Sequence, residues 1–155
     1  MSIEESYNFR RVDERVTTSG IVGAPQLEEL RDQGYEAVVN LKPDIEAELG
    51  VDEGAVVRDQ GIDYVYLPVD FDAPTHADYE AFAAAMDERD GRTIHVHCAA
   101  NYRVTAFYGV YAVDRGRWTE DEAGAFVRDV WDPSEFPAWQ TFLDAEYARI
   151  NRRPR

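Results

Sequence analysis

The sequence predicts an α/β protein in which helices cover both faces of a mostly parallel sheet of four to five strands. Short runs rich in β-branched residues alternate with longer runs whose apolar residues recur at helical spacing. After residue 100 the predicted elements are all helices. Strands that alternate with helices pair in parallel, because each crossover returns the chain to the same end of the sheet.

Four segments have the length and composition of strands, and turn residues bound each of them. They are residues 15–20 (RVTTSG), 36–41 (EAVVNL), 63–69 (DYVYLPV) and 93–97 (TIHVH). The β-branched run at 36–41 is typical of a buried strand. The run at 63–69 alternates apolar and polar side chains, which also favours a strand.

Six helical segments lie between and after these strands. In order they are LEELRDQ after Pro25, an acidic stretch that begins at Pro43 and Asp44 and breaks at Gly50 or Gly54, DYEAFAAAMDERD, YRVTAFYGVYAVDR, TEDEAGAFVRDVW and EFPAWQTFLDAEYARI. Gly34 and Gly91 follow the first and third segments, where a glycine ends a helix without steric cost. Thr75 is a good N-cap for the third, and Thr119 with Glu122 predicts a capping box at the fifth.

Length and composition indicate one globular domain. The chain has 155 residues, 45% of them hydrophobic and 30% charged, and we expect residues 1–155 to form a single domain rather than two. No apolar run approaches the roughly 20 residues of a membrane span. The N-terminal residues MSIEESYNFRR lack the apolar core of a secretory signal, so we expect a cytoplasmic protein with no membrane partner. The single cysteine excludes an intramolecular disulfide, which fits a reducing compartment.

The formal net charge of -15 argues against nucleic acid as a partner. Binding to a phosphate backbone needs clustered lysine and arginine, and here only Lys42 among the 16 basic residues is a lysine. An acidic, lysine-poor surface is typical of a protein from a salt-rich cytoplasm or from a GC-rich genome. Both interpretations stay open.

The segment HCAANYR, residues 97–103, carries the chemistry. In α/β proteins ligands bind beyond the carboxyl ends of the strands, where helix N-termini direct free N–H groups. This segment lies at such a place, between the last predicted strand and the long helix after it. The helix dipole and the guanidinium of Arg103 both favour the thiolate of Cys98, which is a nucleophile at neutral pH. We therefore expect Cys98 to be the nucleophile.

The rest of the loop suits an oxyanion. Ala99, Ala100 and Asn101 have small side chains that leave the backbone N–H groups free to converge on an anion. Asn101 also tolerates the left-handed backbone that a tight loop demands. Arg103 offers a bidentate fork for phosphate or sulfate, and we expect Tyr102 to wall the pocket. The predicted ligand is a phosphorylated substrate, or inorganic phosphate or sulfate.

Two histidines, His95 and His97, share one face of the last predicted strand. No third ligand lies near them in the sequence, so we predict no metal and no cofactor. We instead expect His97 to orient the cysteine loop by hydrogen bonding.

The segment HVHCAANYRVTAF resembles the signature loop of the cysteine-dependent protein tyrosine and dual-specificity phosphatase superfamily. It is most similar to a bacterial and archaeal phosphatase-like branch whose members are found fused to β-lactamase-fold hydrolases. TSGIVGAPQLEELRDQGYEAVVNLKPD, GIDYVYLPVDFDAP and GRWTEDEA resemble other parts of that branch, so the likeness covers most of residues 16–140. It implies a phosphotyrosine phosphatase II-like architecture.

The resemblance also implies a reaction. In it Cys98 attacks phosphorus and forms a phosphocysteine, while Arg103 binds two phosphoryl oxygens. An aspartate on the loop after the third predicted strand would protonate the leaving group and then activate water. The candidates are Asp70 and Asp72, and Asp72 is preferred because it lies further into the loop. Thr105 would be the hydroxyl that stabilises the departing thiolate, although it is not adjacent to Arg103.

The loop departs from the usual phosphatase signature in two ways. Four residues rather than five separate Cys98 from Arg103, and the glycine in the middle of the loop is missing. The phosphatase-like branch tolerates a loop of this length, and rhodanese-type sulfurtransferases use one as well. Three functions therefore stay open: hydrolysis of phosphomonoesters, sulfur transfer through a persulfide on Cys98, and phosphate binding without catalysis.

Overall fold

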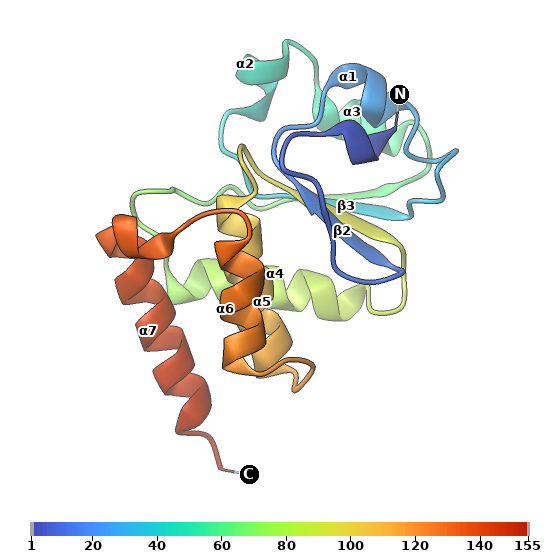
Figure 1. The fold of residues 1–155 in the computed structure, drawn as a ribbon. Coiled ribbons are helices and arrows are strands. Elements are labelled where there is room, and N and C mark those ends of the chain that lie inside the picture. The colour runs from blue at the N-terminus through green and yellow to red at the C-terminus, as the bar shows by residue number, and fades with distance from the viewer. Residues whose placement is uncertain (1, 155) are drawn as a thin grey trace.

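The computed structural model describes residues 2–154, apart from the side chains at positions 47 and 48. Five strands form one sheet in the order β1-β2-β5-β3-β4. β1 (Arg10–Arg11) is antiparallel to β2 (Val16–Ser19), whereas β2, β5 (Ile94–His97), β3 (Ala37–Asn40) and β4 (Asp63–Tyr66) are parallel. The predicted mostly parallel sheet is confirmed, and β5 lies at its centre (Figure 1).

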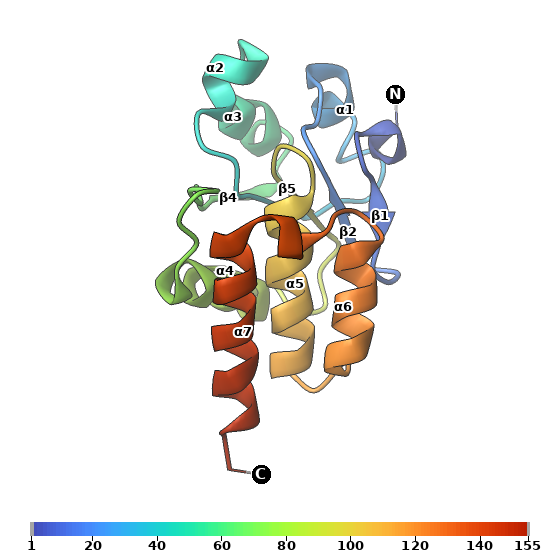
Figure 2. The same cartoon turned by 60° about the vertical axis from the view of Figure 1, so that its left-hand side comes forward.

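Helices cover both faces of the sheet. The helices are α1 (Ala24–Glu28), α2 (Ile45–Leu49), α3 (Glu53–Arg58), α4 (His76–Glu88), α5 (Tyr102–Asp114), α6 (Glu120–Arg128) and α7 (Pro137–Asn151), with short 3-10 turns at Ile3–Glu5 and Pro133–Glu135. Figures 1 and 2 show α1 to α3 on one side of the sheet and α4 to α7 on the other. Within the described residues, no helix has the length and apolar character needed to cross a membrane.

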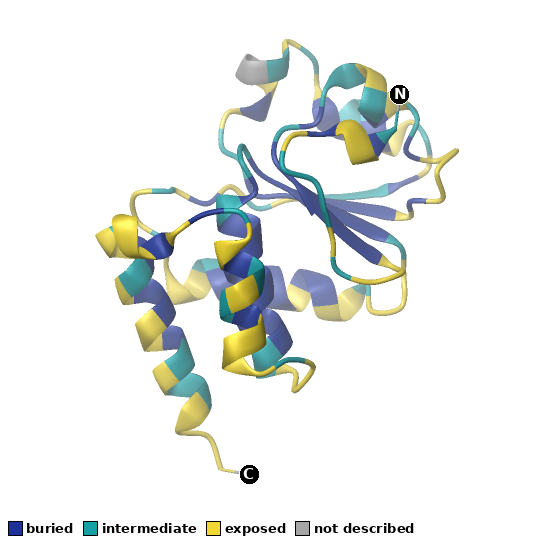
Figure 3. Ribbon diagram, in the orientation of Figure 1, coloured by how far each residue is buried: buried dark blue, intermediate teal, exposed yellow. Residues whose placement is uncertain are grey.

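Side chains that alternate along the central strands fill two separate cores. Val38 packs with Leu27 and Val57 beneath α1 and α3. Its neighbour Val39 faces the other way and packs with Phe107 of α5. The strands β2, β3 and β5 are buried along their whole length, as the dark blue arrows of Figure 3 show. This double burial explains their continuous apolar and β-branched composition.

The acidic stretch after Pro43 forms two helices, not one. α2 ends at Gly50, which has a φ of 71°, and α3 then continues through Gly54. The side chain of Asp52 starts α3 by accepting a hydrogen bond from the N–H of Ala55 (3.0 Å). Gly54 therefore does not break a helix. It allows close packing, because a Cβ there would lie 3.2 Å from the ring of Tyr64.

The remaining predicted boundaries differ by a few residues. The first helix is shorter than LEELRDQ, because residues 29–34 form turns that close at Gly34 with a φ of 89°. The two-residue β1 was not predicted, since it is too short to show a periodic pattern. The predicted caps are confirmed. Thr75 and Thr119 each accept a hydrogen bond from the N–H three residues further on, at 3.0 and 3.1 Å.

Candidate active site

The predicted catalytic loop, residues 98–103, joins the carboxyl end of β5 to the first turn of α5. Because β5 lies between β2 and β3, the loop begins at the middle of the sheet edge. Cys98 is fully buried, and its N–H donates to the carbonyl of Ser19 at the end of β2 (3.3 Å). The thiol is thus held by the sheet at the N-terminal end of a 13-residue helix.

The carbonyl groups of the loop are held from one side. The carbonyl of Ala99 accepts a hydrogen bond from the N–H of Ile21 (2.9 Å), and that of Ala100 accepts one from the side-chain amide of Asn8 (3.0 Å). Gly20 permits this approach, because a Cβ there would lie 2.5 Å from the Ala99 oxygen. In a trans peptide the N–H points opposite to the C=O, so the loop N–H groups are directed to the other side.

These N–H groups have no partner within the protein. Among residues 2–154, the backbone N–H groups from Ala99 to Val104 donate to neither a backbone nor a side-chain acceptor. Asn101, the N-cap of α5, makes no side-chain capping bond to them. A row of free donors at the positive end of a helix is an anion-binding arrangement.

The predicted left-handed conformation of Asn101 is confirmed. Its φ is 67° and its ψ is 12°. The fully buried side-chain amide donates to the carbonyl of Asn8 (2.9 Å) and to the hydroxyl of Thr18 (3.0 Å). Asparagine therefore takes the place of the missing glycine, because it is one of the few residues with a side chain that visit this conformation readily.

Arg103 is a buried cation without a carboxylate partner. The residue is only 8% exposed, and it forms no ion pair within the described part of the chain. One terminal nitrogen donates to the carbonyl of Val69 (2.9 Å), the guanidinium lies 5.6 Å from the centre of the Phe71 ring, and Nε has no hydrogen-bond partner. An unpaired buried charge is costly, so this arrangement is built to receive an anion.

The hydroxyl of Thr105 makes its hydrogen bonds to groups other than Cys98. It lies 2.8 Å from the carbonyl of Asn101 and 3.1 Å from that of Tyr102, either of which can accept its proton. It also accepts a hydrogen bond from the indole N–H of Trp131 (3.0 Å). The hydroxyl therefore fastens the first turn of α5 to Trp131, and the structure does not bring it to Cys98.

Aromatic side chains line the loop next to Arg103. Tyr102 is half-buried and stacks on Trp131, with the ring centres 4.7 Å apart and an interplanar angle of 4°. Phe71 and Phe136 flank Tyr102 at 6.2 and 6.3 Å. The structure thus places Tyr102 in an aromatic cluster beside the loop, and its role in walling a substrate pocket stays a prediction.

The loop after β4 brings two aspartates to this side of the sheet. Its backbone is anchored at Val69 by Arg103 and at Phe71 by the indole N–H of Trp139 (2.7 Å). Both aspartates are exposed. The carboxylate of Asp70 accepts a hydrogen bond from the N–H of Asp72 (2.9 Å), whereas the carboxylate of Asp72 has no partner among the described residues.

His97 links the loop to α3. Its Nε2 lies 2.8 Å from a carboxylate oxygen of Glu53, and both side chains are fully buried. Its Nδ1 lies 3.5 Å from the carbonyl of Cys98. Glu53 could not be recognised from the sequence, because it lies in the acidic stretch after Pro43, where no local pattern marks one carboxylate as a partner of His97. Burial, and then the neighbouring His97, hold the pKa of His95 well below its usual value.

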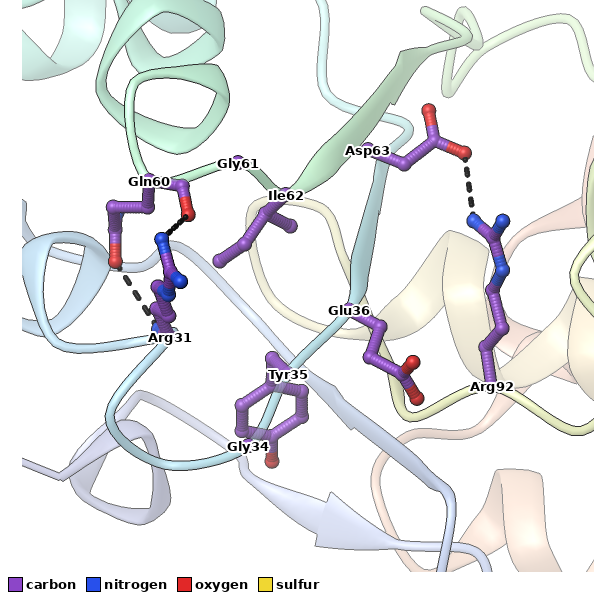
Figure 4. A pocket seen from close by; sticks show the side chains of 9 residues that line it. All are labelled: Arg31, Gly34, Tyr35, Glu36, Gln60, Gly61, Ile62, Asp63 and Arg92. Atoms are coloured by element: carbon purple, nitrogen blue, oxygen red, sulfur yellow. Dashed lines mark hydrogen bonds and ion pairs between the residues drawn. The ribbon is translucent and has the colours of Figure 1, made fainter.

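A surface cavity of about 790 Å³ lies at the other end of the sheet (Figure 4). It surrounds the N-terminal ends of β3 and β4, whereas Cys98 follows the carboxyl end of a parallel strand. Its two arginines have partners within the chain: Arg31 donates to the carbonyl of Gln60 (3.1 Å) and Arg92 pairs with Asp63 (3.3 Å). This cavity therefore lacks the unpaired donors of the cysteine loop.

Comparisons with known proteins agree with this geometry. No protein-family model matches the chain. The crystal structure of a "Putative phosphatase (DUF442)" from Shewanella putrefaciens CN-32 has a TM-score of 0.84 and 34% identity, and the match covers 95% of each chain. The structure of TpbA from P. aeruginosa in complex with pTyr shares the fold, with a TM-score of 0.71 and 16% identity over 99% of this chain and 96% of that one.

A curated relative extends the comparison. The "Beta-lactamase hydrolase-like protein" of Xylella fastidiosa is 32% identical over 117 residues, which is 74% of this chain and 27% of that protein. The chain thus spans about a quarter of the length of the curated relatives that it matches. From the match over nearly the whole length of the Shewanella protein, we conclude that the chain belongs to the DUF442 family, a phosphatase-like family with the fold of protein tyrosine phosphatases.

Proposed function

We propose that this protein is a cysteine-dependent phosphatase that hydrolyses phosphomonoesters through a phosphocysteine on Cys98. One observation carries the proposal: the loop that begins at the only cysteine holds a buried arginine and a row of N–H groups, none of which has a carboxylate or carbonyl partner other than Val69 among residues 2–154. Together they form a cradle for a tetrahedral dianion. The complex of the related TpbA fold with pTyr supports the same class of ligand.

The first step transfers the phosphoryl group to sulfur. The thiolate of Cys98 attacks phosphorus, a P–S bond forms, and the bond to the ester oxygen breaks. The leaving oxygen takes a proton from the carboxylic acid of Asp72. Arg103 and the loop N–H groups stabilise the charge on the other three phosphoryl oxygens.

The second step releases phosphate. The carboxylate of Asp72 takes a proton from water, and the water oxygen attacks phosphorus. The P–S bond breaks, and the electron pair returns to Cys98 as thiolate. We assign this acid–base role to Asp72 because its carboxylate makes no hydrogen bond within residues 2–154, whereas the carboxylate of Asp70 accepts one from the N–H of Asp72 in the turn of the loop.

Hydrolysis of p-nitrophenyl phosphate by the wild type and by Cys98→Ser, from pH 5 to 8, tests the proposal. We expect the turnover of the wild type to disappear in the variant. The variant should still bind inorganic phosphate, because the arginine and the N–H groups remain. Unchanged turnover in Cys98→Ser would refute the proposal.

Sulfur transfer is the second candidate, and the four-residue spacing between Cys98 and Arg103 favours it. Treatment with thiosulfate followed by mass spectrometry distinguishes the two. A gain of one sulfur on Cys98, without turnover of the aryl phosphate, would assign sulfur chemistry. Phosphate binding with neither turnover nor sulfur gain would assign a non-catalytic phosphate-binding protein.

A further inference from the structure

A buried polar chain connects α3 with the cysteine loop. The side chains of Glu53 and His97 are both fully excluded from solvent, and Nε2 of His97 lies 2.8 Å from Oε2 of Glu53. The hydroxyl of Tyr64 donates to the same carboxylate oxygen (2.8 Å), and the side-chain amide of Asn40 donates to the Tyr64 oxygen (3.1 Å). The chain ends at the Cys98 carbonyl, 3.5 Å from Nδ1 of His97.

The hydrogen bond to Glu53 fixes the orientation of the His97 ring. A carboxylate can only accept, so Nε2 of His97 donates to Glu53. The opposite nitrogen, Nδ1, then lies 3.5 Å from the carbonyl of Cys98. The ring is thereby held between α3 and the backbone of Cys98.

Glu53 is poorly explained as a stabilising residue. Its second carboxylate oxygen is buried and has no hydrogen-bond partner in the part of the chain that the structure describes. A buried ion pair contributes little to stability compared with apolar side chains of similar size, and an unsatisfied oxygen reduces that contribution further. A role toward His97 accounts for a carboxylate at this position.

We propose that Glu53 is a positioning residue for Cys98: as the buried acceptor for Nε2 of His97, it fixes the imidazole ring, and the ring in turn orients the backbone of Cys98 at the start of the anion-binding loop. This proposal rests on the proposed phosphatase function for its catalytic meaning. Its effect on the thiol itself can be measured without a substrate.

The other titratable groups that face His97 stay in one state near neutral pH. His95 is next to it on β5, and burial followed by the charge of His97 lowers the pKa of His95 well below its usual value. Tyr64 approaches from β4, and burial followed by the charge of Glu53 raises its pKa. The flanking residues in register on β2 and β3, Ser19 and Asn40, do not titrate. A change in the pH profile of Glu53→Gln therefore reports on the pair with His97.

The test is the rate of alkylation of Cys98 by iodoacetamide between pH 4 and 9, followed by mass spectrometry. Cys98 is the only cysteine, so the modified site is unambiguous. In Glu53→Gln we expect the midpoint of the profile to move up by about one pH unit, because His97 loses the partner that fixes it and the loop N–H groups are then less well placed to stabilise the thiolate. Glu46→Gln, which removes an exposed carboxylate from the neighbouring α2, is the matched control and should leave the midpoint unchanged.

A second pair of variants separates positioning from simple damage to the fold. If Glu53 acts through His97, His97→Asn should raise the midpoint by itself, and adding Glu53→Gln should raise it no further. An unchanged midpoint in Glu53→Gln overturns the proposal. If Glu53→Gln does not fold, an unchanged midpoint in His97→Asn overturns it instead. A wild type that hydrolyses no phosphate ester would defeat the proposed function, while the alkylation profiles would still decide the role of Glu53.

Discussion

Replacement of Asn101 separates two contributions that this side chain makes to the loop. Its amide donates hydrogen bonds to the carbonyl of Asn8 (2.9 Å) and to the hydroxyl of Thr18 (3.0 Å). Loss of both bonds should lower the free energy of unfolding by about 2 kcal/mol, at about 1 kcal/mol each. The backbone φ of 67° adds a conformational strain energy when the new residue has a Cβ and lacks the tolerance of asparagine for this conformation.

Two variants distinguish the loss of the hydrogen bonds from the backbone strain. Asn101→Gly loses the hydrogen bonds and keeps an easy left-handed backbone, so we expect a loss of about 2 kcal/mol. Asn101→Ala loses the same bonds and must also hold a Cβ in this conformation, so we expect about 3 kcal/mol. Inorganic phosphate should bind more weakly to the alanine variant, because relief of the strain turns the loop N–H groups away from the anion.

Urea unfolding followed by tryptophan fluorescence measures both losses. Asn151→Ala, at the exposed end of α7, is the control and should stay within about 0.5 kcal/mol of the wild type. Equal stability of the alanine and glycine variants, or a more stable alanine variant, would refute the argument from backbone conformation. Wild-type stability in both would refute the argument from the hydrogen bonds.

Three further substitutions test other parts of the structure. Asp72→Asn should slow hydrolysis of an alkyl phosphate about a hundredfold or more, because the leaving oxygen loses its proton donor, and Asp70→Asn should slow it far less; equal losses in steady-state kinetics would contradict the assignment. Gly20→Ala places a Cβ 2.5 Å from the oxygen of the first loop alanine. It should reduce stability by about 1 to 3 kcal/mol and impair turnover, and a wild-type urea midpoint would count against this. The hydrogen bond from Arg115 lowers the pKa of Asp87, so this carboxylate stabilises the fold above its unfolded pKa of about 4, and that stability is lost as the pH falls through the folded value. Asp87→Asn should therefore lower the urea midpoint at pH 7, and the deficit should shrink toward pH 3; a constant deficit would disagree.

The position of the cysteine loop could be predicted from the sequence because its determinants are local. The strand 93–97, the small residues after Cys98 and the helical pattern from Tyr102 are adjacent along the chain. Their order alone places a thiol and an arginine at a helix N-terminus. The left-handed backbone of Asn101 could be predicted for the same reason, since it follows from the residue type and the tightness of the loop.

The role expected for Thr105 came from resemblance, and the structure gives its hydroxyl other partners. A hydroxyl in the first turn of a helix has a carbonyl within reach, and here the carbonyls of Asn101 and Tyr102 compete for its proton. The acceptor side of the same hydroxyl is taken by Trp131, 26 residues away in sequence. No local pattern in the sequence indicates that contact.

By itself, the sequence determined the alternation of strands and helices, the cysteine loop and the family resemblance, because each depends on neighbouring residues. Only the tertiary structure decided what holds the loop in its shape. The partners of His97, Asn101 and Arg103 lie 44, 93 and 34 residues away along the chain, and no local pattern links them to the loop. The physical reason is that a buried polar group must find its hydrogen-bond partner in whatever the fold packs against it, and packing is a property of the whole chain.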